Sequence, residues 1–302
     1  MLTRRQILAT SAAATLSSTL PRLAMAELSL GSATLTTVSD GSLTLPGDFI
    51  FAPMPKNELM PILDAAGVDA KSVTPECNLA LYRDGENTVI FDVGSGPDFM
   101  PTAGKVAESL DAIGVAVEDV THVVFTHAHP DHIWGLLDEF DEPLFYEATY
   151  MMGRAEWDYW WNPATVEEIG EARAAFAVGA KRRMEAIEDA VEFFDDGQEI
   201  LPGIAAISSY GHTPGHMAFE VRAGSSSAFV VGDAIGNHHV AFAKPNWESG
   251  SDQDAAMAVK TRMQLFDRIT SAKAHVVGFH LPGGGIGQIE TAGDGYRFVM
   301  EG

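Results

Sequence analysis

The stretch Thr126-His-Ala-His-Pro-Asp-His132 decides the fold of this chain. It follows the short apolar run His122 to Thr126, which predicts a buried strand. Three imidazoles and one carboxylate are therefore crowded together at a strand end. On an extended loop, residues two apart point the same way, so the first two histidines can hold one ion while the aspartate and the third histidine face a second. Imidazole and carboxylate suit Zn²⁺ or a similar first-row ion.

Three later motifs place further candidate ligands just beyond apolar strands. Gly211-His-Thr-Pro-Gly-His216 forms a turn before one strand. Asp233 ends the strand around Phe229, 21 residues after His212, and His280 ends the last strand, 47 residues after Asp233. Strand ends at a sheet edge are rigid positions, so these side chains can complete a metal site there.

The remaining pattern predicts a single domain of mixed α and β structure. The chain alternates between β-rich and α-rich parts, which fits two sheets packed face to face with helices outside. Residues 45–60, with three prolines, predict a long loop with exposed apolar side chains. Residues 144–147 predict a strand, residues 151–154 a helix, and residues 165–187 one continuous helix.

The first 26 residues have the pattern of an export signal. Arg4 and Arg5 precede a mildly apolar stretch, and Ala24-Met-Ala26 is an A-x-A cleavage site. The paired arginines resemble the bacterial twin-arginine signal, with a general secretory signal and a retained anchor as alternatives. We expect residues 1–26 to be removed, leaving the domain 27–302 in the periplasm or secreted.

Charge and cysteine content exclude several classes of partner. The chain has 19 Lys and Arg against 42 Asp and Glu, a formal net charge of −23. Such a surface repels nucleic acid and anionic lipid. The single cysteine, Cys77, rules out an internal disulfide and a Cys-rich zinc module. After signal removal we expect a soluble protein without nucleic-acid or membrane partners.

The series H-x-H-x-D-H, G-H-T-P-G-H, G-D and F-H resembles the metallo-β-lactamase superfamily over nearly the whole mature chain. The resemblance implies an α+β fold, the αββα sandwich, with a dinuclear metal site at one edge of the sheets. It assigns His127, His129 and His212 to one metal and Asp131, His132 and His280 to the other. Asp233 would bridge them. The implied cofactors are two divalent ions, Zn²⁺ by default, with Mn²⁺, Co²⁺ or Fe²⁺ fitting the same ligands.

Details of the motifs favour a hydrolase within this superfamily. Asp233 stands where the commonest β-lactamases have cysteine, and His129 where the di-iron oxidoreductases usually have glutamate. The tail from His280 resembles the exported methyl parathion hydrolase group. Gly236 replaces the tyrosine of the related quorum-quenching lactonases. We therefore expect hydrolysis of small neutral esters, lactones or organophosphate triesters.

The implied mechanism uses a hydroxide shared by the two metals. Asp131 would orient this hydroxide and pass its proton to the leaving group. Thr126, Thr213 and His216 are candidate partners of the ligands by their proximity in sequence. The alternatives are a non-hydrolytic metal-dependent oxidoreductase of the same fold, a β-lactamase-like hydrolase of cyclic amides, and a metal-binding interaction protein.

Aromatic residues are the candidate walls of a pocket for a small-molecule substrate. Trp157, Trp160 and Trp161 crowd one segment, and Phe51 lies with Phe49 and Ile50 on the proline-rich stretch. His238 and His239 could reach the pocket mouth and donate a proton in place of the missing tyrosine. The competing interpretation of the aromatic cluster is core packing or a contact in a homodimer.

Overall fold

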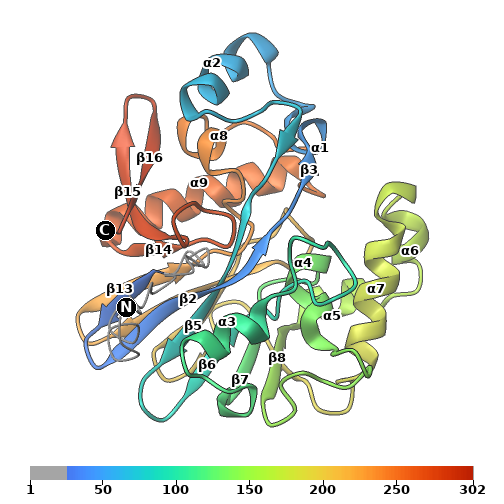
Figure 1. The fold of residues 1–302 in the computed structure, drawn as a ribbon. Helices are drawn as coiled ribbons and strands as arrows, with labels where there is room; N and C mark the ends of the chain where they lie inside the picture. Colours follow the sequence, from blue (N-terminus) through green and yellow to red (C-terminus); the bar gives the residue numbers. More distant parts are fainter. Residues whose placement is uncertain (1–25, 302) are drawn as a thin grey trace, which may run out of the picture.

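Two seven-stranded sheets form the framework of the molecule (Figure 1). The computed structural model describes residues 26–301, so the predicted signal lies outside the described residues except for Ala26. The strands of the first sheet run in the order β1 (Glu27–Leu30), β2 (Ala33–Ser42), β5 (Glu76–Arg83), β6 (Thr88–Phe91), β7 (His122–Phe125), β8 (Thr149–Gly153) and β9 (Glu192–Phe194). Those of the second run in the order β10 (Glu199–Leu201), β11 (Ile204–Ser208), β12 (Met217–Ala223), β13 (Ser226–Val230), β14 (His275–Val277), β15 (Ile286–Ala292) and β16 (Gly295–Met300).

Helices cover the outer faces of the two sheets. On the first sheet they are α3 (Val106–Ala112), α4 (Pro130–Ile133), α5 (Arg154–Trp161) and α7 (Ala174–Glu185), with the short α6 (Thr165–Glu168) beside α7. On the second they are α8 (His238–Ala243) and α9 (Ala255–Ala272). The elements α1 (Gly47–Phe51) and α2 (Lys56–Ala66) and the pair β3 (Leu45–Pro46) and β4 (Ser72–Val73) lie beyond the sheets, where α2 packs on α8 (Figure 1).

Side chains point alternately to the two faces of a strand, and in both sheets both faces are buried. In β7, Val123 and Phe125 pack under the helices, whereas Val124 packs between the sheets. In the second sheet, Phe219 faces the first sheet and Ala218 faces the helices. A strand covered on both sides reads as a continuous apolar run, as residues 122–126 do. The four layers confirm the predicted αββα sandwich and its single α+β domain.

Parallel pairing brings the sequence motifs to one edge. Strands β6, β7, β8 and β9 are parallel to one another, and so are β13 and β14. The carboxyl ends of parallel strands lie at the same edge of a sheet, so the segments after β6 and β7 meet there. The segments after β13 and β14 meet in the second sheet in the same way.

Four expectations about local structure, for residues 144–147, 151–154, 45–60 and 165–187, are wrong. Residues 144–147 are not a strand; the strand is β8, whose Met151 and Met152 pair with β7 although their composition favours a helix. Residues 45–60 contain α1 and the first five residues of α2 rather than a long loop, and Pro55 stands directly before α2, where its missing N–H is not needed. The predicted helix 165–187 is interrupted at Gly170, whose φ is +89°.

None of the helices within residues 26–301 combines the length and apolar character that a membrane crossing requires.

Candidate metal centre and its cavity

All seven predicted metal ligands meet in two buried groups. The first group is His127, His129 and His212, and the second is Asp131, His132, Asp233 and His280. Within each group, the candidate ligand atoms lie within 4.8 Å of one another. Each group draws on both sheets, because the loop after β7 and the start of α4 carry four of the residues, while the segments before β12, after β13 and after β14 carry the other three.

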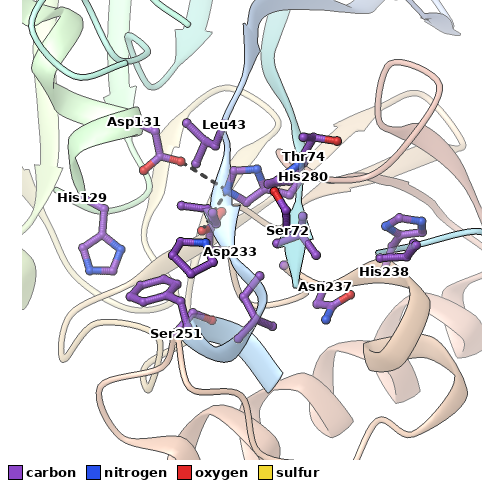
Figure 2. A pocket seen from close by; sticks show the side chains of 18 of the residues that line it. Leu43, Ser72, Thr74, His129, Asp131, Asp233, Asn237, His238, Ser251 and His280 are labelled. Atoms are coloured by element: carbon purple, nitrogen blue, oxygen red, sulfur yellow. Dashed lines mark ion pairs between the residues drawn. The ribbon is translucent and has the colours of Figure 1, made fainter. Parts of the chain in front are cut away.

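Asp233 lies between the two groups. Its Oδ2 is 3.3 Å from His212 Nε2 and 3.3 Å from His280 Nε2, and its Oδ1 is 3.3 Å from His132 Nε2. Asp131 Oδ2 is 3.2 Å from His280 Nε2, and Figure 2 shows Asp131 and Asp233 approaching His280 from different sides. Asp233 is therefore placed where a ligand shared by two ions would stand.

In each of the five imidazoles, one ring nitrogen points towards the centre of the group (the inner nitrogen) and the other points away from it (the outer nitrogen). Each outer nitrogen faces a partner. His127 Nδ1 is 3.0 Å from Thr126 Oγ1, and His280 Nδ1 is 2.8 Å from the Glu76 carbonyl oxygen. His129 Nε2 is 3.4 Å from the amide nitrogen of Gln253. Such partners orient a ligating imidazole and fix which nitrogen carries the proton.

Two of these partners are carboxylates. His132 Nδ1 donates to Asp92 Oδ2 at 2.8 Å, and His212 Nδ1 donates to Asp252 Oδ1 at 3.0 Å. Asp92 also accepts from the backbone N–H and the hydroxyl of Thr126. Because a carboxylate oxygen cannot donate, the outer nitrogens carry the protons, and in a neutral ring the inner nitrogens present lone pairs.

The inner nitrogens are arranged to bind a cation rather than to form hydrogen bonds with one another. His129 Nδ1 lies 3.1 Å from His127 Nε2 and 2.9 Å from His212 Nε2, so three ring nitrogens converge on one point. In the second group, three buried inner atoms have no hydrogen-bond partner: Asp131 Oδ2, His132 Nε2 and Asp233 Oδ1. Converging nitrogen and oxygen donors with bonded outer partners are suited to divalent ions, so the residues fit the two ions expected.

The charges of the two groups differ. Burial, together with the neighbouring imidazoles, holds the pKa of His127 and of His129 well below its ordinary value. In the second group burial acts in the same direction, but the nearby carboxylates outweigh it and raise the pKa of His132 and of His280 well above the ordinary value. The second group therefore attracts positive charge, and the first group offers neutral nitrogen ligands.

The three candidate partners of the ligands are all near the site. Thr126 contacts His127 and Asp92, as above. Thr213 donates to Glu156 Oε2 at 2.7 Å, and His216 Nε2 accepts from the backbone N–H of Asp233 at 3.0 Å.

The sequence reasoning missed Asp92, Glu156, Asp252 and Gln253. Asp92 carried a usable signal, since it is an acid directly after an apolar strand.

A cavity of about 640 Å³ opens above the two groups. Its lining includes five of the seven candidate ligands, from both groups, and Figure 2 shows Asn237 and His238 across the cavity from His129. The apolar walls are Leu43, Leu45, Phe49, Ile50, Val68, Val73, Phe99, Met100 and Phe176. None of the described residues lining this cavity is a lysine or arginine.

The aromatic cluster does not form the walls of this cavity, which corrects the expectation. Trp157 is buried in the core and stacks on Trp161, with ring centroids 5.0 Å apart. Trp160 is buried beside His129, edge to face. Phe51 packs inward against α2. The three tryptophans pack in the core between α5 and the first sheet, and Phe51 packs in a separate cluster of α1 and α2.

The other predicted wall residues do line the cavity. Phe49 and Ile50 do so from α1, and His238 and His239 from α8. Burial lowers the pKa of His238 to about 3, with the neighbouring His239 acting in the same direction, and lowers that of His239 to about 4.

Solved structures share the fold of this chain. The solved dizinc quorum-quenching lactonase AidC, in complex with a product, is 23% identical, with a TM-score of 0.86 over 92% of this chain and 97% of that chain. The hydrolase AbOPH, described as in the beta lactamase superfamily, is 25% identical, with a TM-score of 0.85 over 92% of this chain and 98% of that chain.

Curated relatives match shorter stretches. A probable metallo-hydrolase of Mycobacterium tuberculosis is 25% identical over 202 residues, 57% of this chain and 61% of that protein. An N-acyl homoserine lactonase of Azorhizobium caulinodans is 30% identical over 131 residues, 42% of this chain and 45% of that protein. The match to the curated relatives thus spans about half of their length.

The profile of the family described as "Metallo-beta-lactamase superfamily" matches residues 75–277, which include six of the seven candidate ligands. Since this match covers well over half of the sequence, the chain belongs to the metallo-beta-lactamase superfamily.

Proposed function

We propose that the protein is a dinuclear metallohydrolase of small neutral lactones and esters, with organophosphate triesters as a further substrate class. One observation carries the proposal: two groups of buried nitrogen and oxygen ligands form the floor of an apolar cavity without a lysine or arginine in its walls. The similarity to a dizinc lactonase solved with its product supports the same conclusion.

Seven residues would hold the ions. His127, His129 and His212 would bind one, and Asp131, His132 and His280 the other, with Asp233 shared between them. Two bound divalent ions supply a water activated at neutral pH and polarise a carbonyl or phosphoryl oxygen. The nitrogen and oxygen ligands accommodate Zn²⁺, the ion named for AidC, as well as Mn²⁺, Co²⁺ and Fe²⁺.

Asp131 is the residue we propose for moving the proton. Its buried carboxylate lines the cavity floor, so it can accept a proton from the attacking water and deliver it to the leaving group. His280 Nε2 lies 3.2 Å from Asp131 Oδ2, so the two side chains face the same point of the second group. Burial alone would raise the pKa of Asp131, but the neighbouring His132 and His280 outweigh it and keep the carboxylate ionised and able to accept.

The walls of the cavity select the substrate. Apolar side chains from α1 and from the segments around β3 and β4 would hold an alkyl or aryl group and exclude bulk water. The lining holds no lysine or arginine, so the walls offer neither of these side chains to an anionic substrate. A neutral ester or lactone with an apolar substituent satisfies both conditions.

A substrate panel on metal-quantified protein tests the proposal. The panel holds a δ-lactone, an acyl-homoserine lactone, an aryl ester, a phosphotriester and a cephalosporin. We expect about two ions per chain and turnover of the lactones and the aryl ester, with His129→Ala losing both an ion and turnover. Turnover of the cephalosporin alone would favour a hydrolase of cyclic amides, and tightly bound iron with redox turnover would favour an oxidoreductase.

We also propose that the chain is exported, on the basis of the twin-arginine pattern in residues 1–26. N-terminal sequencing of the protein recovered from periplasm and medium tests this. We expect it to begin at Glu27, and recovery of the intact chain from the cytoplasm alone would contradict export.

A further inference from the structure

Glu156 is a buried carboxylate that contacts both loops of the first metal group. It lies in α5 and is 1% exposed. Its Oε1 accepts from the backbone N–H of Ala128 at 2.9 Å and from the indole N–H of Trp160 at 2.6 Å. Its Oε2 accepts from the hydroxyl of Thr213 at 2.7 Å and from the backbone N–H of Gly215 at 3.0 Å. One side chain thus makes four hydrogen bonds.

Hydrogen-bond donors rather than a cation stabilise this carboxylate. Within residues 26–301, Glu156 forms no ion pair. Three of its four partners are N–H groups, which can only donate. If Glu156 were protonated, only the hydroxyl of Thr213 could accept a hydrogen bond from its O–H. Burial raises the pKa of Glu156, and the four hydrogen bonds act in the opposite direction by favouring the ionised form.

The two loops that Glu156 joins come from different sheets. Ala128 lies between His127 and His129 in the loop after β7, and Thr213 follows His212 in the turn before β12. The turn is packed directly on α5, because a Cβ on Gly215 would lie 2.1 Å from the backbone nitrogen of Glu156. No other carboxylate among the described residues accepts hydrogen bonds from both of these loops.

We propose that Glu156 is a positioning residue that sets the spacing of His127, His129 and His212, and with it the affinity for the first ion. The inference rests on the metal binding in the proposed function. Metal sites tolerate distance errors of only about 0.2 Å, so a shift of one loop relative to the other weakens binding. The second group lacks this link, because Glu156 makes no hydrogen bond to the segments that carry Asp233 and His280.

The variant Glu156→Gln tests the proposal, because it keeps the size of the side chain and turns an amide NH₂ towards groups that can only donate. Zn²⁺ and Co²⁺ affinities are measured by competition with a chelator, and the Co²⁺ absorption spectrum reports the ligand set. We expect two ions in the wild type. In the variant, one ion should bind with unchanged affinity and the other about 10- to 100-fold more weakly.

Two reference variants separate positioning from general stability. His129→Ala lacks one of the three first-group ligands and should not hold the first ion. The Glu156→Gln spectrum should therefore match that of His129→Ala at low Co²⁺ and that of the wild type at high Co²⁺. Asp40→Asn is the matched control, because Asp40 is also buried and accepts from backbone N–H groups, of Ser95 and Lys105, in loops without first-group ligands. It should lower the stability and leave both affinities unchanged.

Unchanged affinities in folded Glu156→Gln would overturn the inference, whereas a wild type that binds no ion would overturn the proposed function. Thr213→Val decides the question if Glu156→Gln does not fold. It removes one of the four bonds and keeps the side-chain shape, so we expect a smaller loss of affinity for the same ion. An unchanged affinity in Thr213→Val would then count against the inference.

Discussion

Replacing Asp252 with asparagine should weaken binding of the first ion and destabilise the fold at the same time. Asp252 Oδ1 accepts from His212 Nδ1 at 3.0 Å, and its Oδ2 is 3.3 Å from a guanidinium nitrogen of Arg262 in α9. All three side chains are 5% or 6% exposed. One buried carboxylate therefore orients a metal ligand and neutralises a buried cation.

The two effects have different sizes. Breaking a buried ion pair by removing one partner costs about 3–5 kcal/mol. We expect about 3 kcal/mol, the lower end, because Arg262 keeps its 2.9 Å hydrogen bond to the Trp247 carbonyl oxygen. Losing a carboxylate partner of a ligating imidazole weakens metal binding about 10- to 100-fold, which corresponds to about 1.4–2.7 kcal/mol.

Urea unfolding of the metal-free protein measures the first effect, and chelator competition measures the second. Arg262→Met is the control, because it removes the cation and leaves Asp252 on His212. It should lower the unfolding free energy while the affinity for the first ion changes less than about threefold. In the double variant, the loss of stability should be smaller than the sum of the losses in the two single variants, since no charge is left without a partner. An Asp252→Asn protein with wild-type stability and wild-type affinity would refute the reasoning.

Three further predictions concern the cavity and the packing around it. Phe49→Ala removes an apolar wall, so steady-state kinetics should show KM for a long-chain lactone raised about 5- to 30-fold at nearly constant kcat, and an unchanged KM would contradict this wall. Because their pKa values of about 3 and 4 lie below the unfolded value of about 6.5, His238 and His239 should show no NMR titration between pH 8 and 5. The unfolded chain then binds more protons, so these histidines lower stability as pH falls from about 6.5 to 4, and an inflection near pH 6.5 would argue against this. Gly215→Ala places a Cβ 2.1 Å from a backbone nitrogen of α5 and should lower the unfolding free energy by about 1–3 kcal/mol in urea, whereas Gly236→Ala, whose Cβ meets only ordinary contacts, should not.

The sequence was sufficient to predict the seven candidate ligands and the layers that carry them. His127 and Asp233 belong to unrelated parts of the chain, yet each directly follows an apolar strand, and parallel strands end at a common edge. Residue type and strand position together are local signals, so they can be read without knowing the packing. The αββα sandwich came from the resemblance to the metallo-β-lactamase superfamily, because periodicity alone predicts only a single domain of mixed α and β structure.

The residues that support the ligands could not be predicted in this way. Glu156 and Asp252 occur in segments rich in other acids, and no local pattern distinguishes them from solvent-exposed carboxylates. Their roles depend on contacts with residues 28 and 40 positions away. The prediction that the tryptophans of α5 line the cavity was wrong for a related reason. Composition shows that Trp157 and Trp160 are large and apolar, but not which side of the helix the core covers.

The division of each metal group between the two sheets has a consequence for the kinetics of folding. His127 and His212 are 85 residues apart in the chain, and His132 and His280 are 148 apart. A complete ligand set therefore arises only after both sheets have formed and docked, so ions bind late and cannot guide the earlier steps. Interactions absent from the transition state slow unfolding without speeding folding. The ions would thus act on the lifetime of the native state, holding the sheets together as two non-covalent cross-links in a chain without disulfides within residues 26–301.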